Sequence, residues 1–257
     1  MLHIVNFFPS LKEMPKLFVE ENGEHEKVAL SGKKVMGFSA LKACTGYGSR
    51  DGQLTCMNRA INTRQCPTCA YLDKSRAFTV GDFSLYPELY EECKKQEYSI
   101  YVVGFGQDIK KCGITRKERL LERWVEQGAD FAAEIGIFLG PDEVYSVEET
   151  VQSHFGLSNA VRADSKMKRL EFDYAKAKLG FGQMLADIEQ SGLLAENAGE
   201  MKVREMREYY PDAKGANASV EINGEIKGSK GQLLFYEKGG KKFVVNMRDK
   251  ISRYVEE

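Results

Sequence analysis

The sequence predicts a mixed α+β fold: a β-β-α-β-α core, preceded by a cysteine-rich module and followed by helical and antiparallel β segments. Residues 98–156 hold two β-rich runs, a helical pattern, a third β-rich run and a second helical pattern. Four of the six cysteines gather in a segment without sustained periodicity. The end of the chain returns to short β-rich runs separated by glycines.

The length and composition of the chain limit its possible domain organisation and its possible binding partners. The 257 residues exceed one average domain, and 42% hydrophobic with 29% charged residues is ordinary for a soluble globular protein. We divide the chain into an N-terminal β and zinc-binding region (1–95), the core (96–165), a helical segment (166–212) and a C-terminal β segment (213–257). A net charge of −1 excludes a global basic field, so a nucleic-acid site must be a local patch.

No apolar run approaches the roughly 20 residues that span a bilayer. The first residues lack the basic start and the small-residue cleavage site of a signal peptide. We therefore expect a cytoplasmic protein without a membrane partner.

Before the core, alternating apolar runs in residues 1–40 predict strands. Residues 42–75, rich in Cys, Gly, Asn, Arg and Thr, need a source of order other than an apolar core. The acidic stretch over residues 80–97 predicts a short helix.

Within the core, YSIYVVGF and IKKCGIT predict a hairpin that turns at Gly106 to Asp108. RKERLLERWVEQG predicts a helix that ends at Gly128. FAAEIGIFLG predicts a strand, and a second helix is expected to begin near Pro141. Beyond the core, residues 169–190 and 199–210 read as helices, and Asn223-Gly224 and Gly239-Gly240 as hairpin turns.

The cysteine-rich segment carries a candidate metal site. Cys66 and Cys69 form a C-x-x-C turn, which directs two thiolates at one point, as tetrahedral zinc requires. Cys44 and Cys56 complete a four-thiol set that would be closed and structural. A redox pair and a set of unrelated buried thiols are the alternatives, although no thioredoxin-like βαβ pattern surrounds the turn.

The core resembles the GIY-YIG nuclease family. The family's two tripeptides correspond to Ser99–Tyr101 and Lys111–Gly113, its helix arginine to Arg123, and its metal-binding carboxylate to Glu148 or Glu149. The whole chain also resembles a domain family with three parts in this order: a Cys-rich N-terminus, a GIY-YIG-like core and a β-rich C-terminus. In that family the core contains the sequence RW followed by QGA, and the C-terminal part contains the sequence G-x-K-G-Q. Here those motifs read Arg123-Trp124, Gln127–Ala129 and Gly228–Gln232.

The resemblance implies a metal-dependent endonuclease that hydrolyses phosphodiester bonds. Tyr101 would help to activate water, Arg123 would pair with the phosphate, and a glutamate would bind Mg²⁺ or Mn²⁺. Helical periodicity favours Glu148, because Glu149 lies nearly opposite the apolar face. Lys111 occupies the position of the tyrosine in the family's second tripeptide, and we include it among the candidate catalytic residues. A lysine contacts phosphate but is a poor base unless its pKa falls, so a variant nuclease and a non-catalytic binder both stay open.

The expected partner is nucleic acid, with DNA favoured over RNA. A basic cluster after the second helix could contact phosphates or form a solvated loop, and a helix N-cap at Ser158 or Asn159 is an alternative for its first members. The cluster consists of Asn159, Arg162, Lys166, Lys168 and Arg169. A third hypothesis is a protein-interaction role for edge strands of the C-terminal β segment.

Overall fold

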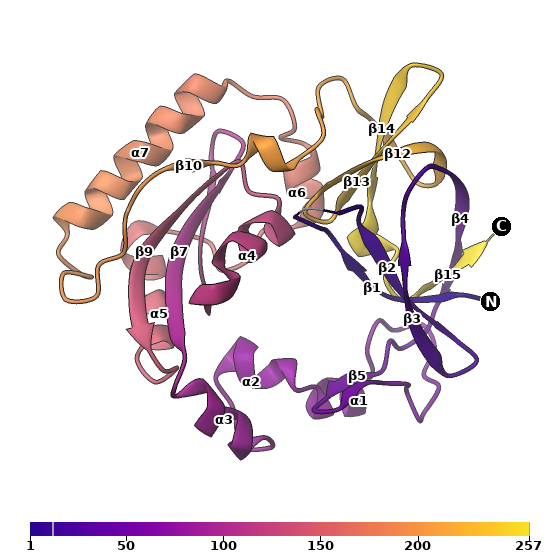
Figure 1. The fold of residues 1–257 in the computed structure, drawn as a ribbon, viewed down its shortest axis with the longest axis horizontal. Coiled ribbons are helices and arrows are strands. Elements are labelled where there is room, and N and C mark those ends of the chain that lie inside the picture. The colour runs from indigo at the N-terminus through magenta and orange to yellow at the C-terminus, as the bar shows by residue number, and fades with distance from the viewer. Residues whose placement is uncertain (12, 257) are drawn as a thin grey trace. The chain divides into compact units, whose positions relative to one another are not determined.

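The computed structural model describes residues 1–11 and 13–256, and the chain divides into two compact units (Figure 1). Unit 1 consists of Met1–Pro87 and Gly215–Glu257, and unit 2 is Glu88–Lys214. Most of the first and last predicted segments lie in unit 1, but residues 88–95 and 213–214 belong to unit 2 together with the core and helical segments. The mixed α+β class is confirmed.

Unit 1 is built on a nine-stranded sheet with the order β11-β14-β13-β12-β4-β15-β1-β2-β3. The central strand β4 pairs with β12 on one side and with β15 on the other, both antiparallel. Because β12 and β15 come from the C-terminal part, neither end of the chain completes this sheet alone. The strands are β1 (His3–Phe8), β2 (Lys16–Glu21), β3 (Glu24–Ala29), β4 (Lys33–Lys42), β11 (Asn217–Ser219), β12 (Ile222–Lys230), β13 (Leu233–Lys238), β14 (Lys241–Asn246) and β15 (Arg253–Glu256).

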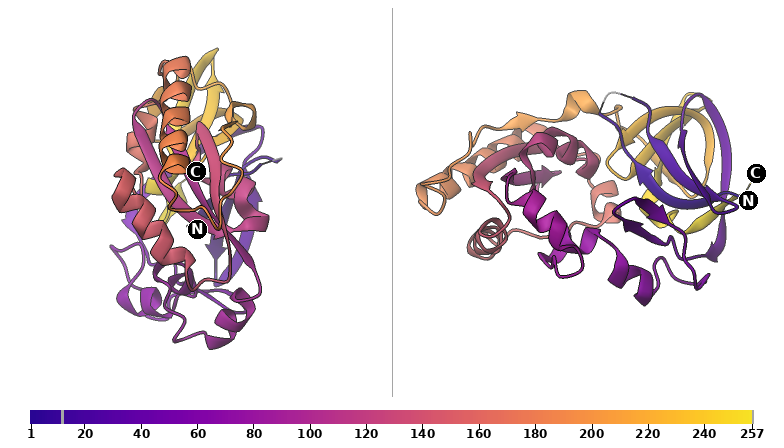
Figure 2. Two further views of the ribbon diagram at one scale, coloured as in Figure 1. Left: turned by 90° about the vertical axis from the view of Figure 1, so that its left-hand side faces the viewer. Right: turned by 60° about the horizontal axis from the view of Figure 1, so that its bottom comes forward.

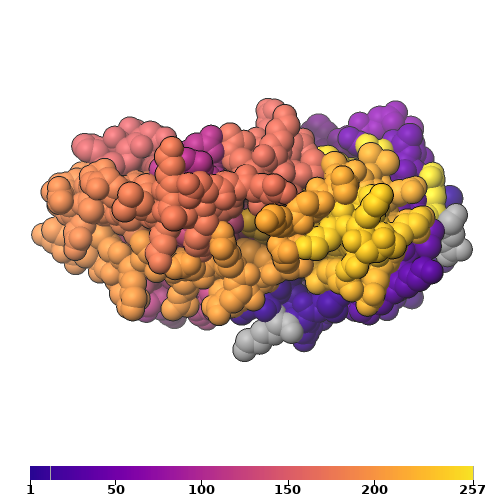
Figure 3. All heavy atoms as spheres, turned by 90° about the horizontal axis from the view of Figure 1, so that it is seen from above, coloured from indigo at the N-terminus to yellow at the C-terminus, as the bar shows by residue number. Residues whose placement is uncertain are grey.

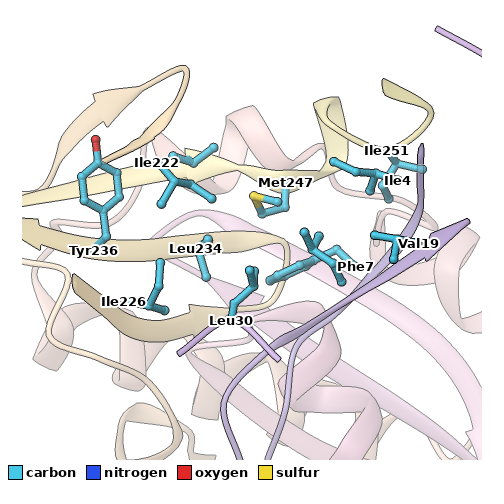
Figure 4. Packing of buried hydrophobic residues seen from close by; sticks show 12 residues of the cluster. Ile4, Phe7, Val19, Leu30, Ile222, Ile226, Leu234, Tyr236, Met247 and Ile251 are labelled. Atoms are coloured by element: carbon cyan, nitrogen blue, oxygen red, sulfur yellow. The ribbon is translucent and has the colours of Figure 1, made fainter. Parts of the chain in front are cut away.

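The core of unit 1 comes from residues that alternate along these strands. Leu17 and Val19 in β2 are buried, and Phe18 between them points to the other face. Figure 4 shows the same layer receiving side chains from both ends of the chain, including Phe7 and Leu234. The hydrophobic contact between distant segments explains why two sequence-predicted regions become one unit.

One of the two expected hairpin turns in the C-terminal segment is confirmed. Gly239 and Gly240, both with positive φ, join β13 to β14. The turn expected at Asn223-Gly224 is wrong, because both residues lie inside β12. A Cβ on Gly224 would lie 2.3 Å from the carbonyl oxygen of Glu237, so the glycine permits the close approach of β13.

Unit 2 contains a four-stranded sheet with the order β10-β9-β7-β8. Its elements reproduce the expected β-β-α-β-α order, and Gly128, with φ of 69°, ends the first helix as predicted. They are β7 (Glu97–Phe105), β8 (Ile109–Arg116), η1 (Lys117–Arg119), α4 (Leu120–Gln127), β9 (Phe131–Leu139), α5 (Val144–Phe155), α6 (Ala163–Met167), α7 (Tyr174–Gln190), β10 (Arg204–Glu205) and η2 (Arg207–Tyr209).

Helices lie on both faces of this sheet, as the two views of Figure 2 show. Gly104 in β7 faces Phe181 of α7, because a Cβ at Gly104 would lie 3.0 Å from that ring. Tyr101, three residues earlier, contacts Gln127 of α4 on the other side. The helix α7 and the segment after it form most of the surface of unit 2 seen in Figure 3.

The helix expected over residues 199–210 is wrong. Arg204 and Glu205 form the short strand β10 along the edge of β9, and η2 follows it. Met206 is fully buried, whereas Glu205 and Arg207 are exposed. Pairing with β9 and burial of Met206 therefore override the helix propensity of this charged segment.

The segment between β4 and unit 2 contains only short elements. The strands β5 (Tyr47–Ser49) and β6 (Gly52–Leu54) form a small hairpin. The helices α1 (Pro67–Leu72) and α2 (Ser75–Val80) follow. The helix α3 (Pro87–Cys93) begins at the boundary with unit 2 and confirms the helix expected within residues 80–97. The 3-10 helix η3 (Met247–Asp249) lies near the C-terminus. Among the described residues, no helix is both long and apolar enough to cross a membrane.

Candidate functional site

The hairpin of β7 and β8 brings Tyr101 and Lys111 together over Gly113. Tyr101 lies opposite Gly113 in the antiparallel register, and Lys111 is two residues from Gly113 and so projects from the same face. A Cβ on Gly113 would lie 2.6 Å from the Tyr101 hydroxyl and 3.1 Å from the Lys111 Nζ. The absence of a side chain at Gly113 therefore lets the phenol and the ammonium group occupy one place.

Helix α4 adds Arg123 and Gln127, which lie one turn apart on the same side. The Gln127 amide donates a hydrogen bond to the fully buried Tyr101 hydroxyl. Burial raises the pKa of Tyr101 to about 12, and the charge and hydrogen bond of Arg123 oppose that rise. The phenol is therefore protonated at neutral pH. Arg123 also pairs with Glu126 at 2.9 Å, and its side chain is partly exposed.

Helix α5 supplies Glu148, which is half-buried and accepts a 2.8 Å hydrogen bond from Gln152. Glu149 is exposed, as its position in the helix predicts. Burial raises the pKa of Glu148, and the Lys111 charge opposes that rise. Burial likewise lowers the pKa of Lys111, and the Glu148 charge opposes that fall.

Lys111 and Glu148 thus interact electrostatically, although within the part of the chain that the structure describes no ion pair joins them directly. The Lys111 ammonium instead donates to the carbonyl oxygen of Cys112 at 3.0 Å. The cluster therefore combines a carboxylate, two cations and a protonated phenol. Carboxylate oxygen is the donor that hard cations such as Mg²⁺ prefer, and Glu148 is the one such group among these four residues.

The sequence-predicted basic cluster divides into two groups. Asn159, Arg162 and Lys168 are exposed. Lys166 is tied to the fold, since its Nζ donates to the Gln127 carbonyl at 2.7 Å and lies 4.1 Å from the centre of the Phe105 ring. Arg169 makes a bidentate pair with Asp108 at 2.7 and 2.9 Å.

The alternative of a helix N-cap at Ser158 or Asn159 is wrong. The N-cap of α6 is Arg162, and its side chain makes no capping hydrogen bond. Ser158 instead extends the pairing of β8: its backbone nitrogen donates to the Lys110 carbonyl, and its carbonyl accepts from Cys112, both at 3.2 Å. This backbone pairing anchors the chain after α5 beside the Lys111 strand.

The cysteines of the candidate metal site come together in unit 1 as a four-cysteine cluster. Their Sγ atoms all lie within 4.8 Å of one another, and all four side chains are buried. Cys44 follows β4, Cys56 follows β6, and Cys66 and Cys69 lie at the start of α1. The alternative that these are unrelated buried thiols is therefore excluded.

The distances within the four-cysteine cluster fit a tetrahedral metal site. With Zn–S bonds of about 2.3 Å, tetrahedral geometry places neighbouring sulfurs about 3.8 Å apart, and the Cys56 and Cys66 sulfurs are 3.8 Å apart. A disulfide requires about 2.05 Å. The Cys66 backbone N–H donates a hydrogen bond to the Cys44 sulfur at 3.2 Å. Burial raises the pKa of the Cys44 thiol, and this hydrogen bond opposes that rise. With four sulfur donors, such a site has no open position and is structural.

We call the group around the phenol the Tyr101 cluster; it consists of Tyr101, Lys111, Gly113, Arg123, Gln127 and Glu148. Two of its residues were not assigned a role from the sequence. Gln127 contacts the phenol directly and also connects, through its carbonyl, to Lys166. The signal was its position four residues after Arg123, which places both side chains on one helical face. Gly113 matters through the side chain that it lacks, which a sequence pattern alone does not reveal.

The fold and these sites define a mixed α+β protein with a buried four-cysteine cluster. Residues 34–255 match the model of the family described as Protein of unknown function (DUF2797). The match covers most of the chain, which therefore belongs to DUF2797. It begins in β4, ends in β15, and includes both the four-cysteine cluster and the Tyr101 cluster. No curated protein and no solved structure matches the chain.

Proposed function

We propose that this protein is a metal-dependent endonuclease of the GIY-YIG type. The observation that carries the proposal is the convergence of Tyr101, Lys111, Arg123 and Glu148 from two strands and two helices. The resemblance to the GIY-YIG family implies the same four residues as one catalytic set. Their order along the chain and the β-β-α-β-α arrangement add support.

In the proposed reaction, a water oxygen attacks phosphorus, the bond to the leaving oxygen breaks, and the water proton passes to solvent. Glu148 would hold Mg²⁺ or Mn²⁺, which when bound supplies neutralisation of the charge that develops on the leaving oxygen. Arg123 and Lys111 bind the non-bridging phosphate oxygens. Tyr101 accepts from Gln127 and Arg123, so its own proton is available to orient the water.

We further propose that the four-cysteine cluster binds structural Zn²⁺. The sulfur spacing, the four buried thiols and the short elements around them support this assignment. A metal cross-link would order residues 43–73, which contribute few members to an apolar core.

The central experiment compares Glu148→Gln with Glu149→Gln in a plasmid-nicking assay with Mg²⁺ or Mn²⁺. The two variants remove the same charge from adjacent positions of α5. We expect the Glu148 variant to lose at least about 100-fold in rate, because several kcal/mol of charge stabilisation disappear with the cation. The Glu149 variant should cut at the wild-type rate. Equal activity of the two variants would remove the catalytic assignment.

A non-catalytic nucleic-acid-binding protein is the second candidate. It is favoured by Lys111 at the position of the second tyrosine and by the complete burial of the Tyr101 hydroxyl. In the same assay, it predicts no product with any divalent cation, while labelled DNA still binds in a salt-dependent manner.

A further inference from the structure

Unit 1 contains a hollow of about 720 Å³ beside the four-cysteine cluster. Ligand sites in proteins commonly have volumes of about 300–1,000 Å³. One side comes from β1 and β2, and the other comes from the segment that holds the cysteines. We call it the Arg64 pocket, and the lining residues that matter here are Phe8, Phe18, Arg64, Asp73, Lys74 and Arg248.

The cations of the Arg64 pocket lack partners. Among the described residues, the side chains of Arg64, Lys74 and Arg248 form no hydrogen bond or ion pair. Arg64 precedes the cysteine turn, Arg248 lies near the C-terminus, and the charges of the two guanidinium groups act on each other. Two guanidinium groups from distant parts of the sequence therefore face the same hollow and repel each other.

The one carboxylate among the described lining residues does not neutralise them. Asp73 accepts hydrogen bonds from the Gly48 nitrogen at 3.3 Å, the Gln65 amide at 2.9 Å and the Ser75 nitrogen at 2.9 Å. Its oxygens are thus engaged in holding the turn after α1. The pocket keeps an excess of positive charge with guanidinium donors free, which suits an anion that accepts several hydrogen bonds.

The pocket also presents two aromatic rings. Phe8 and Phe18 are half-buried, their ring centres are 6.0 Å apart, and they lie on the face of the sheet opposite the apolar core. Aromatic rings beside cations are the combination with which proteins hold single-stranded nucleic acid, because a base stacks on the ring while the backbone pairs with the charges. A free carboxylate or inorganic phosphate would use only the charges.

We propose that the Arg64 pocket binds a nucleotide unit of single-stranded nucleic acid, with its phosphate at Arg64 and Arg248 and its base on Phe8 and Phe18. This inference deepens the proposed nucleic-acid function, on which it rests, by giving the protein a binding site separate from the Tyr101 cluster.

The test measures binding of fluorescein-labelled dT15 to the full-length protein by anisotropy, without Mg²⁺ and over a series of salt concentrations. The charge variant is Arg64→Gln/Arg248→Gln, and the stacking variant is Phe8→Leu/Phe18→Leu. The matched control is Lys238→Gln/Lys241→Gln, which removes two charges from the exposed turn between β13 and β14 of the same unit. Zinc content and thermal melting establish that each variant is folded.

We expect the charge variant to weaken binding about 10-fold or more and to reduce the slope of log K against log salt by about 0.7 for each phosphate that is no longer neutralised. The stacking variant should weaken binding about 5- to 150-fold and leave that slope unchanged. The control should bind as the wild type does. Thymidine monophosphate should compete with dT15, and inorganic phosphate should compete much less well.

Three outcomes would overturn the inference: normal binding by the charge variant, normal binding by the stacking variant, or equal competition by inorganic phosphate. Failure here is separable from failure of the endonuclease proposal. If Glu148-dependent cleavage occurs while the charge variant binds normally, only the pocket inference falls. If no cleavage occurs but dT15 binding depends on Arg64 and Phe8, the pocket inference stands alone.

Discussion

At the residue scale, burial draws the pKa values of Lys111 and Glu148 toward each other. The pKa of Glu148 is raised above its ordinary 4.5, so the carboxylate that would hold a cation forms only at higher pH. The pKa of Lys111 is lowered below 10.5, so the charge that would bind phosphate is lost earlier as pH rises. The two shifts act at opposite ends of the pH range.

We therefore predict a bell-shaped pH profile for single-turnover cleavage, with both limbs displaced inward from 4.5 and 10.5. Lys111→Arg should move the alkaline limb upward, because a guanidinium keeps its charge throughout this range. Glu149→Gln should leave both limbs in place. An alkaline limb at the same pH in Lys111→Arg would mean that another group controls it.

Gly113 provides a second residue-scale prediction. The Cβ of Gly113→Ala would lie 2.6 Å from the Tyr101 hydroxyl, so the buried phenol must shift. We expect the variant to lose about 1–3 kcal/mol of unfolding free energy through overpacking and most of its activity. The matched control is Gly180→Ala in α7, where a Cβ would meet nothing within 4 Å. That variant should gain about 0.5–1 kcal/mol in urea denaturation.

At the element scale, the zinc proposed for the four-cysteine cluster, rather than apolar packing, would order the segment that carries it. The hairpin β5–β6 and helix α1 are each shorter than an independently stable element. We predict one zinc per chain, lost in Cys69→Ser and retained in Cys93→Ser, which replaces a buried cysteine outside the cluster. Because binding of structural zinc contributes about 10 kcal/mol or more to the free energy of folding, Cys69→Ser should expose residues 43–73 to proteolysis. Full zinc content in Cys69→Ser would contradict the assignment.

Element predictions succeeded where the partners are neighbours in sequence. The β7–β8 hairpin and the helix α4 follow from a short turn and from helical periodicity, respectively, both of which are local. The predictions failed where contact with a segment distant in the sequence determines the local conformation. The strand β10 takes its conformation from β9, and Gly224 takes its place within β12 from the approach of Glu237. A local sequence pattern cannot predict either of these long-range interactions.

At the scale of the whole molecule, the same limit applies to the sites. Tyr101, Lys111, Arg123 and Glu148 could be selected because motif order ties them together over a short stretch. The pairing of the first and last segments in one sheet, and with it the approach of Arg64 to Arg248, depends on long-range strand contacts that no motif encodes. The Arg64 pocket was therefore found only in the structure.

The division into units makes a prediction about the isolated parts. Residues 88–214 contain every strand of the four-stranded sheet and the entire Tyr101 cluster, so we expect this fragment to fold alone, with cooperative thermal unfolding and dispersed amide signals in NMR spectra. Residues 1–87 alone should not fold as they do in the full chain, because β4 would lose both β12 and β15 and expose the apolar layer of Figure 4. Co-expression of 1–87 with 215–257 should restore that sheet, since the two pieces together supply all nine strands. A well-folded 1–87 fragment, or an unfolded 88–214 fragment, would show that the stability of the chain is not partitioned along this boundary.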